Sequence, residues 1–341
     1  MTFIAASVFA VRRPLQIVAA VLLAVISTNG TRVPLPAIPA DPPPATLRPL
    51  EVSGERFGEL TLRRAWSINL ADRRLGGFST IASVEENRAG ALAFTFVTDA
   101  GRVLDLALTA ERRVAAQRWR RVRAVGAAFG TAVRLDSESM IPATGARGGW
   151  VAGLEAPPRL ALLDNALSVV ATRRDPPMRR WTSNSGPEGL VRLRDGRLLV
   201  FAERAASASG VAGRSLLIYP ADPFARGAAA PVEVAYDDAA RGAVTDATRL
   251  SDGRVLILHR RGDPFRGWTS TLAVADPREL RPNAAWRART IARIEHGPWR
   301  ENFEGVAVTG RGGDSRVWLI SDDNFHRLQR SLLLELSCPD R

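Results

Sequence analysis

Carboxylate side chains recur at matched positions along this sequence, at a spacing that could support chemistry. They stand second in tetrapeptides that line up along the chain ("FSTI", "SESM", "PEGL", "TDAT" and "FEGV"). These second residues are Ser79, Glu138, Glu188, Asp246 and Glu304, separated by steps of 59, 50, 58 and 58 residues. Carboxylates that converge from such a repeat could bind a hard cation such as Ca²⁺, or act as general acid and base.

A second set of polar residues ends the next apolar run of each unit. The set consists of Asp99, Glu155, Glu203, His259 and Asp322. If the repeat closes on itself, we expect both sets to lie near one face of the molecule. Several carboxylates in one place repel one another and raise their pKa values, which indicates that a cation or arginines lie beside them.

The same acids also have a structural interpretation, because Asp and Glu at turns and strand starts accept hydrogen bonds from backbone N–H groups. Structural acids, a Ca²⁺-type site and direct catalysis all remain open. For catalysis, the candidates are Glu188 and Glu304 as acid and base, with His259 as a proton shuttle. The alternative for His259 is a hydrogen-bonded histidine beside arginines.

The segments that must position these residues are short apolar runs separated by turn signals such as "DGR" at 195–197 and 252–254. Each unit begins with the run that contains its tetrapeptide and continues with a second and a third apolar run. In four units a fourth segment follows. Four strands per unit, with a period of 50–60 residues, predict an all-β fold of the β-propeller type.

The length from residue 57 onward predicts five blades, with six as the alternative if the step from Ser79 to Glu138 hides a degenerate blade. The last unit lacks a fourth strand at its C-terminal end. The segment 58–69 ("GELTLRRAWSIN") could supply that strand from the N-terminal side and close the ring.

The N-terminal segment carries export signals. Arg12 and Arg13 precede an apolar run at 15–26 and a small polar exit, which predicts a signal peptide over 1–30, with a retained anchor as the alternative. Sec and twin-arginine export both remain open, and either predicts a periplasmic or secreted bacterial protein. Prolines dominate the next stretch, which predicts a linker over 31–56 before a propeller domain at 57–341.

The composition and net charge limit the classes of binding partner that we expect. The chain has a net charge of +12 and no lysine, so arginine supplies all of its 47 basic residues. We expect a small anionic ester as substrate, no nucleic acid, a monomer, and membrane contact only if the N-terminal segment is retained. Cys338 is the only cysteine, so no intramolecular disulfide can form.

The motifs of this chain resemble those of the phytase-like family, labelled "esterase-like activity of phytase". The resemblance rests on "GGFSTI", "SESM…GGWVAGLEAPPRL", "NSGPEGLVRLRDGRLLVFAER", "DATRLSDGRVLILHRR" and "NFEGVAV…VWLISDDNF…QRSLLLEL", in that order. It implies a secreted β-propeller distantly related to alkaline phytases, which use Ca²⁺ to bind phosphate esters. The chain departs from the family pattern at His259, where Glu is usual, and at Ser139, where Gly is common.

The resemblance implies a metal site, and the positions that match the motif are Glu188, Glu203, Glu304, Asp322, Asp323 and Asn324. The first hypothesis is a Ca²⁺-dependent hydrolase of phosphate or carboxylic esters. In it, Arg204, Arg260 and Arg261 hold an anionic substrate. The alternative is a non-catalytic propeller that binds a ligand or partner and whose acids are structural.

Overall fold

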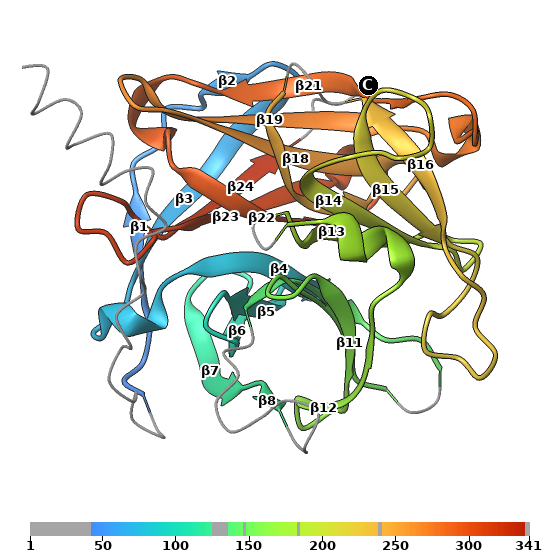
Figure 1. Cartoon of the computed structure of the whole chain (residues 1–341). Coiled ribbons are helices and arrows are strands. Elements are labelled where there is room, and N and C mark those ends of the chain that lie inside the picture. Colours follow the sequence, from blue (N-terminus) through green and yellow to red (C-terminus); the bar gives the residue numbers. More distant parts are fainter. Residues whose placement is uncertain (1–41, 125–135, 146–147, 183–184, 238–240, 338–341) are drawn as a thin grey trace, which may run out of the picture.

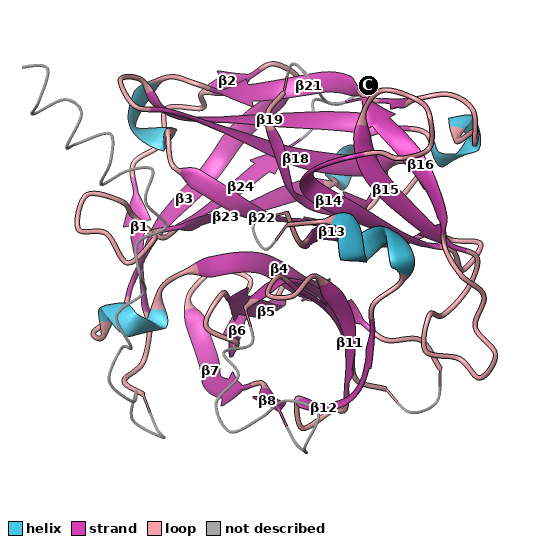
Figure 2. Ribbon diagram, in the orientation of Figure 1, coloured by secondary structure: helices cyan, strands magenta, loops and turns pink. Residues whose placement is uncertain are grey.

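The computed structural model describes residues 42–124, 136–145, 148–182, 185–237 and 241–337. Five small antiparallel sheets are arranged as the blades of a ring (Figures 1 and 2). The predicted five-bladed β-propeller is therefore confirmed.

The first two blades follow the chain order and lie in the lower half of Figure 1. Blade 1 consists of β4 (Phe78–Glu86), β5 (Leu92–Thr98), β6 (Arg102–Leu108) and β7 (Val114–Arg121). Blade 2 consists of β9 (Ser137–Pro142), β10 (Trp150–Leu154), β11 (Arg159–Leu163) and β12 (Ser168–Arg173). The short strand β8 (Arg123–Ala124) runs parallel to β12 at the outer side of blade 2.

Blades 3 and 4 have the same arrangement. Blade 3 consists of β13 (Pro187–Arg192), β14 (Leu198–Ala206), β15 (Arg214–Tyr219) and β16 (Val232–Asp237), with β20 (Trp286–Arg287) beside β16. Blade 4 consists of β17 (Ala243–Arg249), β18 (Val255–Asp263), β19 (Gly267–Ala275) and β21 (Arg289–Ile294). Short 3₁₀ turns are η1 (Arg73–Leu75), η3 (Pro176–Arg180), η4 (Pro277–Glu279), η5 (Gly297–Trp299) and η6 (Gly312–Asp314).

Blade 5 is built from both ends of the described chain. It consists of β22 (Asn302–Thr309), β23 (Arg316–Asp322), β24 (Leu332–Ser337), β3 (Leu60–Asn69) and β1 (Thr46–Leu50), and β2 (Arg56–Phe57) forms a hairpin with β3. Strand β3 pairs antiparallel with β24, with Ala65 opposite Leu334. The predicted closing strand is therefore confirmed, and it covers an edge that β24 would otherwise expose.

The predicted linker is too long at its C-terminal end. Residues 46–50 form β1, which pairs with β3 from Thr46–Asn69 to Leu50–Ala65. Pro49 is accommodated because β1 is an edge strand, where a missing N–H costs no ladder hydrogen bond. The predicted signal peptide lies outside the described residues, and no helix within the described part of the chain is long and apolar enough to span a membrane.

The core lies between neighbouring blades. Trp318 of blade 5 stacks on Trp66 of the closing strand at 6.4 Å and meets the ring edge of Phe94 in blade 1 at 5.0 Å. Between blades 3 and 4, Phe201 packs against Tyr236 and Trp286. Aromatic rings thus fill the wedge between sheets, as expected for large side chains in a close-packed interior.

We predict that Leu62→Ala, in the closing strand, lowers the free energy of unfolding by about 2–5 kcal/mol. Leu62 is fully buried in the cluster shared by blades 4 and 5, so its removal leaves a cavity. Urea titration measures the change. The matched control is Val170→Ala on β12, whose side chain is 58% exposed. Equal effects from the two variants would show that β3 does not hold the ring closed.

Candidate functional site

Each inner strand has a bulge near its first residue, and in four of the five blades the bulged residue is the one that the repeat singles out. The pairing of inner and second strands skips one residue in every blade. The skipped residues are Ser79, Glu138, Glu188, Thr245 and Glu304. Bulges of this kind redirect a side chain out of the ordinary alternation, here at the channel end where the inner strands begin.

The register in blade 4 corrects the sequence alignment by one residue. The bulged position is Thr245 and not Asp246, because Val244 pairs with His259 and Asp246 with Leu258. The second-strand residue equivalent to Glu203 and Asp322 is consequently Arg260 and not His259. A one-residue change of register moves a side chain to the opposite face of a sheet, so the two predicted residues lie elsewhere.

His259 is fully buried between blades 3 and 4 and does not face the channel. Its Nε2 lies 2.9 Å from the Tyr236 hydroxyl, and its Nδ1 lies 3.2 Å from the Thr271 carbonyl oxygen. Burial lowers the pKa of His259 to about 3. The prediction that His259 faces the channel as a proton shuttle is therefore wrong, and the alternative of a hydrogen-bonded histidine fits.

Asp246 is also buried, beside the propeller axis. Its carboxylate accepts hydrogen bonds from the Thr80 hydroxyl at 2.9 Å, from the Val306 N–H at 2.8 Å and from the Ala247 N–H at 2.7 Å. These donors belong to the inner strands of blades 1, 5 and 4. Asp246 therefore links three inner strands. For this acid, the structural interpretation fits.

Two carboxylate clusters lie on the side of blades 2 and 3. Asp136, Glu138 and Glu155 each offer an oxygen within 4.8 Å of the others, and so do Glu155, Glu188 and Glu203. Glu155 belongs to both groups. The sequence predicted Glu188 and Glu203 as ligands, and the structure adds three acids to them. Asp136 was not singled out by the sequence, although it stands directly before "SESM" at the start of β9.

The electrostatics of these clusters fit a bound cation. Burial raises the pKa of Glu138 well above its ordinary value, and the charges of Asp136 and Glu155 raise it further. Burial likewise raises the pKa of Glu188, with added repulsion from Glu138 and Glu203. Buried carboxylates with this much mutual repulsion are stabilised either by protonation or by a positive charge, and an all-oxygen donor set suits a hard divalent ion.

Beside the second cluster, Arg260 supplies positive charge to the channel mouth. Its guanidinium donates to Glu304, to Asn302 at 2.7 Å and to Glu203 at 3.4 Å. It also lies over the ring of Trp268, with 5.1 Å from Cζ to the ring centre. Arg260 thus occupies the register position that holds a carboxylate in the other four blades, and it neutralises the carboxylates of neighbouring blades.

Glu304 is the carboxyl group of the mouth whose pKa lies near neutrality. Burial raises the pKa of Glu304 to about 7, with the attraction of Arg260 opposing the rise and the repulsion of Glu203 adding to it. Its Oε1 also accepts a hydrogen bond from the Asn302 amide at 2.9 Å. A carboxyl group with this pKa can give or take a proton at neutral pH.

The acidic end of β23 is largely occupied in holding a loop. Asp322 accepts a hydrogen bond from the Asn324 N–H at 2.6 Å, and Asp323 accepts one from the Gly77 N–H at 3.2 Å. The Asn324 amide donates to Gln329 at 2.6 Å. Burial raises the pKa of Asp322 well above its ordinary value. Among the described residues, neither carboxylate cluster includes these three, so their predicted role as metal ligands stays a prediction.

The predicted substrate-binding arginines lie at different depths. Arg260 is 15% exposed and lies inside the ring of acids. Arg204 is 59% exposed, and its guanidinium lies 3.1 Å from Glu203 at the rim. Arg261 is exposed on β18. Arg204 is thus the one of the three that an incoming anion would meet beside the carboxylate clusters.

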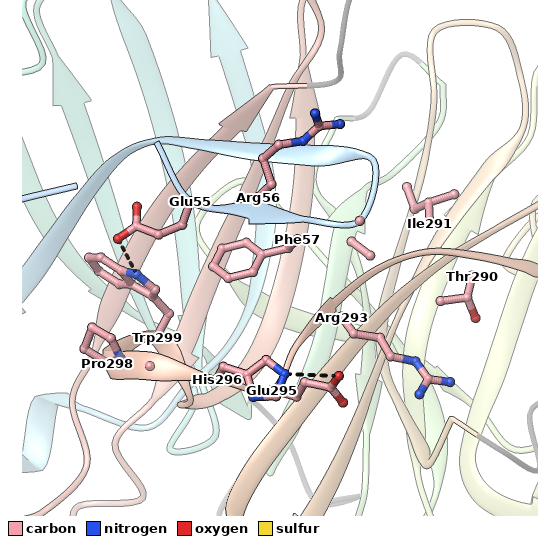
Figure 3. A pocket seen from close by; sticks show the side chains of 13 residues that line it. Glu55, Arg56, Phe57, Thr290, Ile291, Arg293, Glu295, His296, Pro298 and Trp299 are labelled. Carbon is pink, nitrogen blue, oxygen red and sulfur yellow. Dashed lines mark hydrogen bonds and ion pairs between the residues drawn. The ribbon is translucent and has the colours of Figure 1, made fainter. Parts of the chain in front are cut away.

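A hollow of about 730 Å³ lies away from the channel, between the β2–β3 hairpin and β21 (Figure 3). Phe57, Ile291 and Trp299 line it, and two pairs of its polar groups contact one another. The Trp299 indole donates to Glu55 at 3.2 Å, and His296 lies 3.5 Å from Glu295. These groups are already satisfied, so the channel mouth remains the better candidate site.

Comparisons with known proteins identify one matching family. The sequence model of one family, described as "Phytase-like: Esterase-like activity of phytase", matches residues 73–325. No curated protein sequence matches the chain.

Among solved structures, an α-L-arabinofuranosidase of Podospora anserina is similar at 10% identity, with a TM-score of 0.47 over 79% of this chain and 93% of that one. Virginiamycin B lyase of Staphylococcus aureus is similar at 8% identity, with a TM-score of 0.40 over 86% and 99%. The Neurospora crassa Pan2 WD40 domain is similar at 10% identity, with a TM-score of 0.33 over 86% and 75%.

We predict that His259→Gln reduces the acid sensitivity of folding. Between about pH 6.5 and 3 the unfolded chain binds a proton that folded His259 does not, so this residue lowers stability as the pH falls through that window. Relative to wild type, the variant should gain up to about 1.4 kcal/mol per pH unit on acidification. Urea unfolding at several pH values measures the difference. The control is His296→Gln, whose side chain is 87% exposed, and an identical pH dependence for both variants would contradict the prediction.

Proposed function

The chain belongs to the phytase-like family, and we propose that its channel mouth is the site of a divalent-cation-dependent ester hydrolase. Ca²⁺ is the expected ion, and phosphate esters are the first substrate class, with carboxylic esters second. The observation that carries the proposal is the pair of carboxylate clusters that share Glu155. A shared carboxylate between two oxygen-rich clusters is suited to two neighbouring cations.

In this proposal Asp136, Glu138 and Glu155 hold one cation, and Glu155, Glu188 and Glu203 hold a second. A bound cation supplies the charge that polarises the ester oxygen and offsets negative charge on the reacting group. The chain itself supplies the orientation of the carboxylates, because the inner-strand bulges fix Glu138 and Glu188 at the same level of the channel.

The remaining residues of the mouth would serve the substrate. Arg204 lies at the rim, where its planar fork can bind an anionic ester in bidentate fashion. Glu304 has a pKa near 7 and can take up a proton as water attacks, or return one to the leaving group. Arg260 orients Glu304 through a direct hydrogen bond and is a positioning residue.

Export to the periplasm or the medium is part of the proposal, since the N-terminal sequence pattern predicts a signal peptide. The alternative function is a non-catalytic propeller that binds a ligand through the same mouth. One observation favours it: Arg260 already neutralises Glu203 and Glu304, as a structural network of charges would.

We predict that Glu155→Gln combined with Glu188→Gln abolishes cation binding and ester hydrolysis. The double substitution removes the shared ligand and a buried partner while keeping side-chain volume. Metal analysis and calorimetric Ca²⁺ titration measure binding, and a panel of phosphate and carboxylic esters measures activity. Stability without Ca²⁺ should rise, because two mutually repelling carboxylates, buried Glu188 and half-buried Glu155, are replaced by neutral amides.

The matched control is Glu59→Gln together with Glu295→Gln, two acids far from the mouth with 39% and 40% exposed side chains. Wild type and control should bind Ca²⁺ and hydrolyse at least one ester class. If wild type binds Ca²⁺ but hydrolyses none of the esters, the binding-propeller alternative holds. If wild-type protein binds no divalent cation and its melting temperature ignores Ca²⁺, the metal site is lost.

We also predict that Arg260→Gln destabilises the protein at neutral pH by about 3–5 kcal/mol, because removing one partner leaves buried carboxylates without a counter-charge. Acidification towards pH 5 should recover part of the loss by protonating Glu304, whose pKa rises further once Arg260 is gone. Urea midpoints at pH 5 and 7.5 measure the effect. Arg261→Gln, an exposed neighbour, serves as the control, and an equal small effect for both would show that Arg260 is not the counter-ion.

A further inference from the structure

A cleft of about 490 Å³ runs along the outer edge of blade 1, three strands away from the channel. It lies between β7, β8 and the turn at Asn165 and Ala166 that precedes β12. Five arginines and a single carboxylate, that of Asp105, are among the residues that line it. The arginines are Arg102, Arg118, Arg120, Arg121 and Arg123.

The charges of this cleft do not balance. Asp105 is occupied by Arg120, at 2.6 and 2.8 Å. Arg102 stands directly opposite Arg121 across the β6–β7 ladder, a position where like charges destabilise a sheet. Burial lowers the pKa of the Arg102 guanidinium, and the Arg121 charge lowers it further.

Asp72 does not resolve this imbalance. It attracts Arg102, but its carboxylate is held by Arg74 at 2.8 Å, and burial and the Arg121 charge outweigh this attraction in setting the pKa of Arg102. In the described ranges of the chain, Arg102, Arg118, Arg121 and Arg123 form no ion pair. Among the residues that the structure describes, Asp105 is the only carboxylate that lines this cleft, so the cleft is strongly electropositive.

Trp119 also lines the cleft, and its indole donor has no acceptor in the part of the chain that the structure describes. The indole Nε1–H of Trp119 is shielded from solvent, and no acceptor for it exists within the described structure. Trp119 stands opposite Leu104 and packs its ring against the core cluster shared by blades 1 and 5. A buried N–H left without a partner costs free energy, so a ligand that brings an acceptor would be favoured there.

We propose that this cleft binds a small multivalent anion bearing phosphate groups, through the Arg102–Arg121 pair and the Trp119 indole. Guanidinium forks match the oxygens of a phosphate group in pairs, and a bound anion would relieve the repulsion between the two arginines. The volume falls in the range of small-molecule pockets, so a metabolite-sized ligand fits better than a polymer.

The competing explanation is that the arginines only block the free edge of β7 against pairing with another strand. Protection of the β7 edge requires exposed charge but no ligand. It does not explain why the indole N–H of Trp119 has no acceptor among the described residues. The two explanations differ in whether an anion changes the stability of the protein.

The test uses the full chain in low-salt buffer with three probes: pyrophosphate, inorganic phosphate and glycerol phosphate. Calorimetry should show one saturable pyrophosphate site, and pyrophosphate should raise the melting temperature. Arg102→Gln with Arg121→Gln should weaken binding about 10-fold or more, and Trp119→Phe, which keeps the ring but loses the donor, should do the same. Without anion, the arginine double variant should melt at the same temperature as wild type or higher.

Arg281→Gln with Arg287→Gln, two exposed arginines elsewhere, is the matched control and should bind as wild type does. Glu155→Gln with Glu188→Gln should also keep pyrophosphate binding, which separates this cleft from the channel mouth. Comparison of phosphate with glycerol phosphate tells whether a free ion or an ester group is preferred. Absence of saturable binding below about 1 mM, or an equal loss in the control, would overturn the proposal. If the arginine variant fails to fold, unchanged binding in Trp119→Phe overturns it as well.

Discussion

The close approach of five inner strands around one axis is the constraint on which the rest of this structure depends. The residue after each bulge faces that crowded axis. At Gly305, an added Cβ would stand 2.5 Å from an Ile320 methyl carbon and 2.7 Å from the Ile81 nitrogen, and Gly189 is similarly confined. Only small residues, or one that hydrogen-bonds its neighbours as Asp246 does, fit there. This crowding explains why Glu precedes Gly at 188–189 and 304–305. The Glu stands at the bulge, where its side chain can point away from the axis.

The bulges bring acids together, and their repulsion is then resolved differently on the two sides of the channel. Beside blades 4 and 5, the guanidinium of Arg260 lies among Glu203, Glu304 and Asn302. Beside blades 2 and 3, the carboxylates gather around Glu155, and Arg204 and Arg260 contact this group through Glu203. Under the function proposed above, this arrangement would let one propeller mouth hold a metal ion beside an anionic substrate.

The period of the sequence predicted the fold, its blade number and the closing strand, because hydrophobic runs and turns are visible residue by residue. The site was predictable only in part. Glu188 and Glu203 were found through the repeat, but in blade 4 both positions were misplaced by one residue. Nothing in "AVTDATR" or "LILHRR" shows where a bulge falls, since a bulge depends on the pairing of two strands and not on either alone. Asp136 was missed because it belongs to a loop entering β9, outside the repeated runs.

The closing strand also has a consequence for the order of folding. Arg64 and Glu335, which meet across β3 and β24, are 271 positions apart in the chain. Blades 1 to 4 can each form from neighbouring segments, but β3 has no β24 to pair with until nearly the whole chain has emerged. Contacts of such long range form slowly, and an unpaired strand edge invites association with other chains. Completion of the last blade is thus the folding step before which a newly made molecule is most prone to aggregate. Until β24 is available, the pairing of β1 with β3 leaves only one edge of β3 unpaired.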